Sequence, residues 1–146
     1  MRNENFERAI AKILKNDSRY PRGAYTLMPV VLDYTVRRVQ EAQRAGKLPF
    51  RGQVSPHVSG QQLAEGFRDY LLEEFGPFAY GIAADLNLHE TLDIGHLVYN
   101  LISVGCFGKT DEDRLEDFNN VYDFHTAFVV PFEVQNPDFK TDTPGV

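Results

Sequence analysis

The 146-residue chain lacks many of the features that mark common enzyme, secreted and membrane classes. It has one cysteine, Cys106, so no internal disulfide can form, and a single thiol without a disulfide framework is typical of a reducing compartment. Tryptophan is absent, although Phe and Tyr provide bulky side chains for a core. The sequence also lacks an internal repeat and a glycine-rich phosphate loop. These absences argue against a disulfide-stapled scaffold and a phosphate-loop nucleotide site.

Long apolar segments are missing as well. No apolar run approaches the roughly 18 residues that a membrane span needs. The first ten residues, MRNENFERAI, are polar and amphipathic and do not contain the apolar segment of a signal peptide. We therefore predict a cytoplasmic protein that does not associate with membranes.

Length and composition are those of one ordinary globular domain. Apolar residues make up 42% of the chain and charged residues 25%. A chain of this size buries roughly 70% of the surface that its unfolded form exposes, so it needs no metal or disulfide to fold. We expect residues 1–134 to form a single domain and the turn-rich residues 135–146 to form a flexible tail.

The net charge of -6 is distributed unevenly along the chain. Residues 1–52 hold 11 Lys and Arg against 5 Asp and Glu, a net +6, whereas residues 53–146 hold 4 against 16, a net −12. Such a division makes the faces of the folded domain electrically distinct, or lets the basic half fold against the acidic half. The sequence leaves both interpretations open.

Hydrophobic periodicity predicts two N-terminal helices. Residues 4–15 and about 22–45 carry apolar side chains at helical spacing, and Gly46 is a plausible stop. Pro29 either kinks the second helix or marks its first turn. The connection at residues 46–58 is long for a compact domain and is either a hinge or a pinned irregular segment.

Three further helices are expected in succession. The first begins with a capping box formed by Ser59 and Gln62 and ends at Gly76. The others span about residues 77–87 and 91–104, and the turn between them is short. This succession is typical of a helix-turn-helix core.

The remaining segments complete the predicted fold. Thr91 is the expected N-cap of its helix, and residues 106–109 could form a short strand. Residues 122–128 predict a helix and residues 128–134 an extended run interrupted by Pro131. The fold class that follows is mainly α, with two N-terminal helices packed on a helix-turn-helix or winged-helix-like core and at most a short β-hairpin.

The predicted helix at residues 91–104 lacks the side chains that read DNA. Recognition helices use Arg, Lys, Asn and Gln to contact base edges and phosphates. The positions expected to face outward here are Asp93, Gly95, His96, Tyr99, Asn100 and Ser103. Because no Lys or Arg occurs in this helix and acidic segments flank it, sequence-specific DNA binding is not expected.

A basic region at residues 37–51 is the better nucleic-acid candidate. Its cations are Arg37, Arg38, Arg44, Lys47 and Arg51, and Phe50 lies among them. Such a stripe could hold an RNA backbone or an acidic partner. Alternatively, these cations are a solvated helix end that complements the helix dipole and pairs with the acidic half.

Metal and cofactor sites are not indicated. Asp93, His96 and Asn100 share a helix face, but the HExxH spacing and paired cysteines are missing. Such a set is more often a hydrogen-bonded surface or an interhelical polar contact. The acidic segment at residues 111–117 resembles a calcium loop in composition only, because it lacks the central glycine and the closing glutamate.

A small enzyme or ligand-binding domain is the alternative function. It would use Cys106 as a nucleophile together with His96 or His125. Cys106, however, lies between Gly105 and Phe107, where a free cysteine most often acts as a small hydrophobe.

Residues 57–124 resemble a family of small bacterial proteins of about this length that has no established activity. The shared pattern reads SGQQL, EEFGP, LDIGHLVYNL, GKTDED and DF in this chain. The matching residues are Ser59, Gly60, Leu63, Gly66, Phe75, Gly76, Pro77, Asp93, Gly95, Val98, Asn100, Leu101, Gly105, Lys109, Thr110, Asp113, Asp117 and Phe118, with weaker matches at Ala24, Tyr25, Asp33, Tyr34 and Thr35. His96 departs from the pattern, which has an acidic residue there. The resemblance implies one defined cytosolic domain.

The sequence therefore predicts a non-enzymatic cytosolic interaction module that binds a protein or a ribonucleoprotein. The candidate protein-binding surface is a polar stripe, defined as Asp93, His96, Tyr99 and Asn100, together with the acidic segment at residues 111–117. The basic region at residues 37–51 is the candidate surface for RNA or an acidic partner.

Overall fold

The structure, a computed structural model, describes residues 4–46 and 57–134. Its elements are α1 (Glu4–Asn16), α2 (Arg22–Arg44), α3 (Gly60–Phe75), the 3₁₀ turn η1 (Gly76–Phe78), α4 (Ala79–Asp85), α5 (Thr91–Ser103), η2 (Leu115–Phe118), α6 (Phe124–Phe128) and η3 (Val130–Phe132). The described residues contain no strand, so the predicted mainly α class is confirmed. The predicted tail and most of the predicted connection at residues 46–58, including Lys47 and Arg51, lie outside the described residues.

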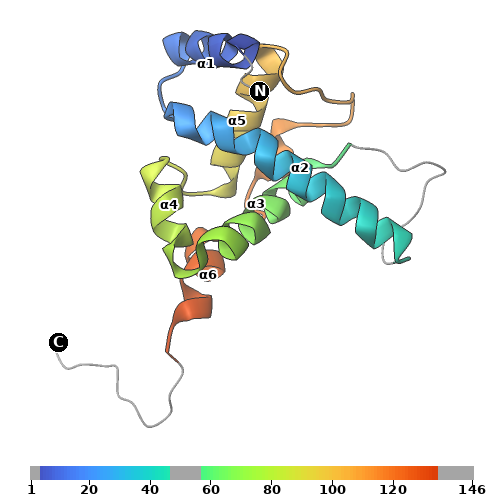
Figure 1. Ribbon diagram of the computed structural model, residues 1–146, viewed down its shortest axis with the longest axis vertical. Coiled ribbons are helices and arrows are strands. Elements are labelled where there is room, and N and C mark those ends of the chain that lie inside the picture. The colour runs from blue at the N-terminus through green and yellow to red at the C-terminus, as the bar shows by residue number, and fades with distance from the viewer. Residues whose placement is uncertain (1–3, 47–56, 135–146) are drawn as a thin grey trace, which may run out of the picture.

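The long helix α2 organises the arrangement of the others (Figure 1). It packs against α3 and α5, and α1 contacts both α2 and α5. The short helices α4 and α6 contact each other and α3 at the end of the molecule away from α1 (Figure 1). Buried side chains from these elements form one hydrophobic cluster. Among the described helices, none is both long enough and apolar enough to cross a membrane.

Pro29 lies inside α2 rather than at its start. The helix begins at Arg22, directly after Pro21, which has extended backbone angles. A proline has no N–H, so the helix continues through Pro29 without one of its backbone hydrogen bonds. Burial of Tyr25, Met28 and Val31 stabilises this stretch despite that loss.

The predicted boundaries of α3 are confirmed, whereas α4 is shorter than predicted: Pro77 lies in η1, and α4 spans Ala79–Asp85. Gln62 donates its backbone N–H to the Ser59 hydroxyl at 3.1 Å, and the Gln62 side chain accepts from the Ser59 N–H at 2.9 Å, which completes the capping box. Gly76 ends α3 with a φ of 51°. Asn87 follows α4 with a φ of 62°, a left-handed conformation that asparagine tolerates.

Thr91 is not the N-cap of α5, contrary to the prediction. It is the first residue of the helix, preceded by Glu90, and its side chain is fully buried. Its hydroxyl donates to the Phe118 carbonyl at 2.5 Å and accepts from the Val121 N–H at 3.1 Å. The N-cap is Glu90, and the carboxylate of Asp93, the third residue of the helix, accepts from the backbone N–H groups of His89 and Glu90.

The C-terminal segments also differ from the prediction. Residues 106–109 form no strand, and the helix expected from residue 122 begins at Phe124. The segment expected to be extended contains η3, because Pro131 fits the first turn of a short helix as readily as it interrupts a strand. Asp123 caps α6 by accepting from the Thr126 N–H at 2.9 Å.

Aromatic side chains attach the C-terminal segment to α3. Phe67 is fully buried and packs against Phe124 and Phe128, with ring centroids 6.3 and 6.4 Å away. Tyr122 stacks on Phe124 and donates its hydroxyl to the Ala64 carbonyl at 2.6 Å. Residues 122–128 therefore contribute to the core, although they form only five residues of helix.

Candidate binding site

Two of the four residues in the polar stripe predicted on α5, Asp93 and Asn100, contact the N-terminal segment. Tyr20 donates its hydroxyl to Asp93 at 2.6 Å. The Asn100 amide donates to Asp17 at 2.9 Å and to the Tyr25 hydroxyl at 3.0 Å. Asp93 and Asn100 thus act as an interhelical polar contact that fastens the α1–α2 turn to α5. Their role in binding a partner stays a prediction.

Hydrogen bonds and burial shift the pKa values of Asp17 and Tyr20 in this contact. Arg19 donates to both carboxylate oxygens of Asp17, and this pairing holds the pKa of Asp17 well below its usual range, despite partial burial. Burial, together with the hydrogen bond to Asp93, raises the pKa of Tyr20 above its usual range. Asp17 is therefore ionised and Tyr20 protonated at all ordinary pH values.

The described cations of the basic region are partly paired with acidic side chains. Arg37 pairs with Asp33 at 2.9 Å, and Arg38 pairs with Asp69 at 3.4 Å while its guanidinium lies over the Tyr34 ring. Arg44 is exposed in the last turn of α2. The Arg38–Asp69 pair joins the basic half of the sequence to the acidic half.

The proposed cysteine nucleophile is not assembled with a histidine in the described residues. Cys106 is half-buried against the core, and burial raises the pKa of its thiol, which disfavours the reactive thiolate. No hydrogen bond is found between Cys106 and His96 or His125, both of which the structure describes. The ring of His125 instead packs edge-on against Tyr80 at 6.3 Å.

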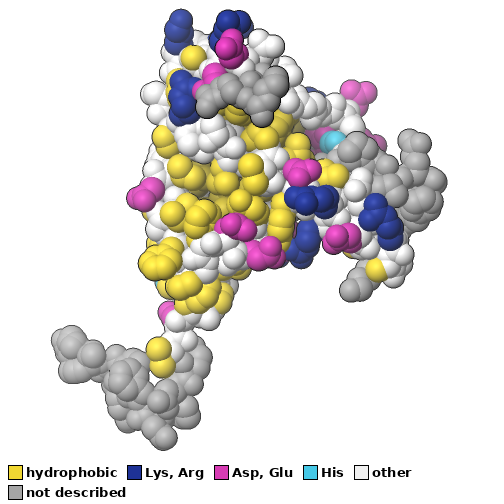
Figure 2. Space-filling model, in the orientation of Figure 1, with side chains coloured by type: hydrophobic (Ala, Val, Ile, Leu, Met, Phe, Trp, Pro, Cys, Tyr) yellow, Lys and Arg dark blue, Asp and Glu magenta, His cyan; other side chains and the backbone are white. Residues whose placement is uncertain are grey.

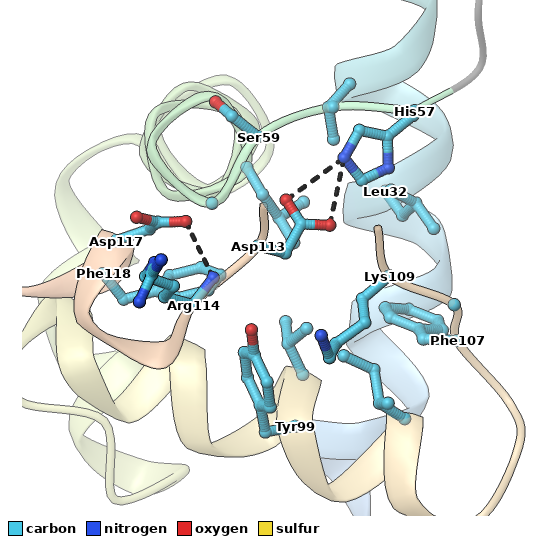
Figure 3. Close-up of a pocket in the computed structure, with 16 residues that line it drawn as sticks. Leu32, His57, Ser59, Tyr99, Phe107, Lys109, Asp113, Arg114, Asp117 and Phe118 are labelled. Atoms are coloured by element: carbon cyan, nitrogen blue, oxygen red, sulfur yellow. Dashed lines mark hydrogen bonds and ion pairs between the residues drawn. The ribbon is translucent and has the colours of Figure 1, made fainter. Parts of the chain in front are cut away.

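A cavity of about 290 Å³ lies between α5, the N-terminus of α3 and the segment at residues 107–118 (Figure 3). We call it the pocket. Its apolar lining consists of Leu32, Val58, Leu63, Val98, Ile102, Phe107 and Phe118. Its polar and charged lining consists of His57, Ser59, Tyr99, Lys109, Asp113, Arg114 and Asp117. An apolar interior with a few convergent polar groups is the usual composition of a binding site.

Phe118 forms one wall of the pocket and is held by two glycines. A Cβ atom on Gly60 would lie 2.9 Å from the Phe118 ring, and one on Gly95 would lie 2.8 Å from it. Only glycine allows α3 and α5 to approach the ring this closely. The expectation that Gly95 faces outward is therefore wrong, because Phe118 covers it and Gly95 is buried.

The carboxylates around the pocket already accept hydrogen bonds from the chain. Asp113 pairs with the His57 imidazole at 3.2 Å and accepts from the Thr110 N–H at 2.8 Å. Burial alone would raise the pKa of Asp113, but these donors outweigh it and keep the pKa below its usual value. Asp117 accepts from the Arg114 backbone N–H at 3.0 Å (Figure 3).

The donors at the pocket are less fully engaged. Lys109 is exposed and donates to the Thr110 carbonyl at 3.2 Å, and the guanidinium of Arg114 makes no ion pair with a described residue. The buried Tyr99 hydroxyl has no hydrogen-bond partner in the part of the chain that the structure describes. Figure 3 shows it pointing into the pocket, between Arg114 and Lys109. Burial, followed by the nearby Asp113 carboxylate, raises the Tyr99 pKa, so this hydroxyl remains a donor.

Sequence reasoning identified Tyr99 and the acidic segment but missed the pocket itself. His57, Lys109 and Arg114 come from segments with no shared spacing in the sequence, and only the folding of residues 107–118 over α5 brings them together. Several residues of the sequence pattern quoted for residues 57–124 line this pocket, namely Ser59, Gly60, Leu63, Val98, Lys109, Asp113, Asp117 and Phe118.

A second surface is apolar and exposed. Phe78 exposes 74% of its surface, and Tyr80, Val130 and Phe132 are also exposed around α4 and η3. Figure 2 shows hydrophobic side chains gathered over this end of the molecule, whereas Lys and Arg side chains gather over α1 and along α2. Exposed apolar patches of this kind often mark contacts with other proteins.

Comparison of the chain with protein-family models, curated proteins and solved structures gave no match. Within the described ranges, no group of three or more His, Cys, Asp or Glu side chains is placed to hold a metal ion.

Two tyrosines allow a matched test of the Tyr99 hydroxyl. Tyr20→Phe removes a hydroxyl that donates to Asp93, so we expect it to lower the free energy of unfolding by about 1–2 kcal/mol. Tyr99→Phe removes a buried hydroxyl without a described partner, so we expect no loss and a gain of up to about 1 kcal/mol. Urea unfolding of both variants measures the difference. A loss of more than about 1 kcal/mol in Tyr99→Phe would show that this hydroxyl has a structural partner.

The α1–α2 contact should make stability depend on pH. The folded pKa of Asp17 is depressed, so its stabilisation is complete above the unfolded pKa near 3.9 and is lost as the pH falls below about 4. Asp17→Asn should therefore be less stable than wild type at pH 7, and the difference should shrink between pH 4 and pH 2.5.

Urea unfolding across this pH range provides the measurement, with Asp33→Asn as the control. Asp33 forms an exposed pair with Arg37, so its substitution should change stability by no more than about 0.5 kcal/mol. A constant difference between wild type and Asp17→Asn from pH 7 to pH 2.5 would refute the assignment.

Proposed function

We propose that the protein is a non-catalytic, cytosolic interaction module that binds a protein partner in the pocket between α3, α5 and residues 107–118. The observation that carries this proposal is a cavity that combines an apolar interior with incompletely engaged donors, Lys109, Arg114 and Tyr99. Buried pockets that accept one large side chain are where partner chains usually gain most of their binding energy.

The size of the pocket supports an anchoring role. Its volume of about 290 Å³ is at the lower limit for sites of small organic molecules, which run from about 300 to 1,000 Å³. It suits one large apolar side chain and the backbone that carries it. The protein partner would cover the rim, where Lys109 and Arg114 are exposed.

The alternatives from the sequence receive less support. An enzyme using Cys106 lacks a described histidine partner for its thiol. RNA or a ribonucleoprotein could contact the exposed Arg44 in the basic region. Arg37 and Arg38, however, already pair with Asp33 and Asp69. We propose that α3, α4 and α5 form a winged-helix-like unit that contacts protein. DNA reading by this unit is not proposed, because α5 carries no Lys or Arg.

Affinity capture with matched variants tests the proposal. The tagged chain is incubated with cytosolic extract, with and without nuclease, and bound proteins are identified by mass spectrometry. We expect one set of partners in both samples and its loss from the double variant Lys109→Glu, Arg114→Glu. The control Lys12→Glu, Lys15→Glu makes the same charge change on exposed positions of α1 and should retain the partners.

A third variant separates the two surfaces. Phe78→Ser with Phe132→Ser makes the apolar end of the molecule polar without altering the pocket. Retention of the partners by this variant is expected. Loss of the partners from this variant alone would move the interface to the apolar end. Loss on nuclease treatment would favour the ribonucleoprotein alternative.

A further inference from the structure

We infer that the pocket recognises a carboxylate attached to an apolar group, and that the C-terminal residue of the partner chain supplies it. This inference rests on the proposed function and specifies the chemistry of its ligand. It follows from the three incompletely engaged donors, from the engaged state of the pocket's own carboxylates, and from the apolar interior beneath them.

The two cations at the rim lack an anionic partner in the described chain. Lys109 keeps donor capacity beyond its contact with the Thr110 carbonyl, since an ammonium group has three N–H donors. The Arg114 guanidinium presents a planar fork of donors that matches a carboxylate. Elsewhere Arg19, Arg22, Arg37, Arg38 and Arg68 each pair with a carboxylate of the chain itself.

The Tyr99 hydroxyl adds a neutral donor deeper in the pocket. It is buried without a described partner and points into the cavity (Figure 3). A buried hydroxyl without an acceptor is unfavourable, and a ligand carboxylate placed between Tyr99 and the two cations would remove that penalty. Hydrogen bonds from such donors to an ionised acceptor are stronger than those between neutral groups.

The carboxylates of the pocket do not fill this role themselves. Asp113 is turned toward His57 and the Thr110 N–H, and Asp117 toward the Arg114 backbone N–H. The charges of Lys109 and Arg114 balance those of the two aspartates that line the pocket. The N-terminus of α3, the positive end of a 16-residue helix, also lies at the pocket through Ser59 and Gly60.

The apolar interior determines what the carboxylate must be attached to. Val98, Ile102 and Phe107 line the same cavity as the donors. An internal Asp or Glu of a partner carries its carboxylate on a short stem and would leave this interior unfilled. A C-terminal Leu, Ile or Phe carries a free carboxylate and a large apolar side chain on the same carbon atom, and so satisfies both parts of the pocket.

Titration of the ¹⁵N-labelled full chain with matched probes tests this inference. The first probe is an acetylated tetrapeptide that ends in leucine with a free carboxylate, and the second is the same peptide with a C-terminal amide. The third is 4-methylpentanoate, a small acid with the same apolar group. We expect the free-acid peptide to bind at least tenfold more tightly than the amide and to shift the amide resonances of Tyr99, Lys109 and Arg114.

Two double variants test whether Lys109 and Arg114 cause the preference for the free-acid peptide over the amide. The double variant Lys109→Ala, Arg114→Ala should bind the acid and amide peptides equally weakly. The control Lys12→Ala, Lys15→Ala should keep the preference, because both residues lie on α1 outside the pocket. Equal affinity of wild type for the two peptides, or no binding of either, would overturn the inference. The captured partners and their loss from the pocket variant would then still support the proposed function.

The small acid distinguishes two sources of the carboxylate, a free small molecule and the C-terminus of a partner chain. If 4-methylpentanoate binds with shifts at the pocket while neither peptide does, recognition of an apolar carboxylate stands. The assignment to a partner's C-terminus is then overturned, while protein binding through the pocket is judged by the captured partners and their loss from the pocket variant. Tighter binding of the peptide than of the small acid supports the inference as stated.

Discussion

The arrangement around the pocket depends on the packing of Phe118 against two glycines. Gly60 opens α3 and Gly95 lies in the first half of α5, and at each position a Cβ atom would meet the Phe118 ring at less than 3 Å. The Phe118 carbonyl also accepts the buried Thr91 hydroxyl. One residue of a short 3₁₀ turn therefore fixes two helices relative to each other and closes the wall of the cavity. Through this clamp η2 contacts both α3 and α5, next to the charged groups of residues 107–118 that line the pocket.

The opposite side of α5 is fixed by polar groups rather than by close packing. Asp93 and Asn100 bind Tyr20, Asp17 and Tyr25, so one side of the helix faces the N-terminal segment while another faces the pocket. Tyr99 belongs to the pocket side, and its hydroxyl has no hydrogen-bond partner among the described residues. The same helix thus contains polar side chains that stabilise the structure and one that is available to a ligand. The predicted polar stripe therefore has two roles: Asp93 and Asn100 stabilise the fold, and Tyr99 lines the pocket.

The helices were largely predictable from the sequence, because each carries a local signal. The Ser59–Gln62 capping box, the Gly76 stop and the left-handed Asn87 are all determined by neighbours within a few residues. Thr91 and Pro131 were misjudged because their roles depend on contacts or geometry that local pattern does not specify. The pocket was not predictable for the same reason. His57 and Asp113 are 56 residues apart, and neither the His57–Asp113 pair nor the approach of Phe118 to Gly95 leaves a periodic trace in the sequence.

The Phe118 clamp is the central claim, and proton–proton distances in the wild-type chain test it most directly. A nuclear Overhauser spectrum of the isotope-labelled protein reports which protons lie within about 5 Å of one another. We expect strong cross-peaks from the Phe118 ring protons to the α-protons of both Gly60 and Gly95. Absence of either set of cross-peaks, with the helices otherwise intact, would contradict the clamp and the pocket geometry that depends on it.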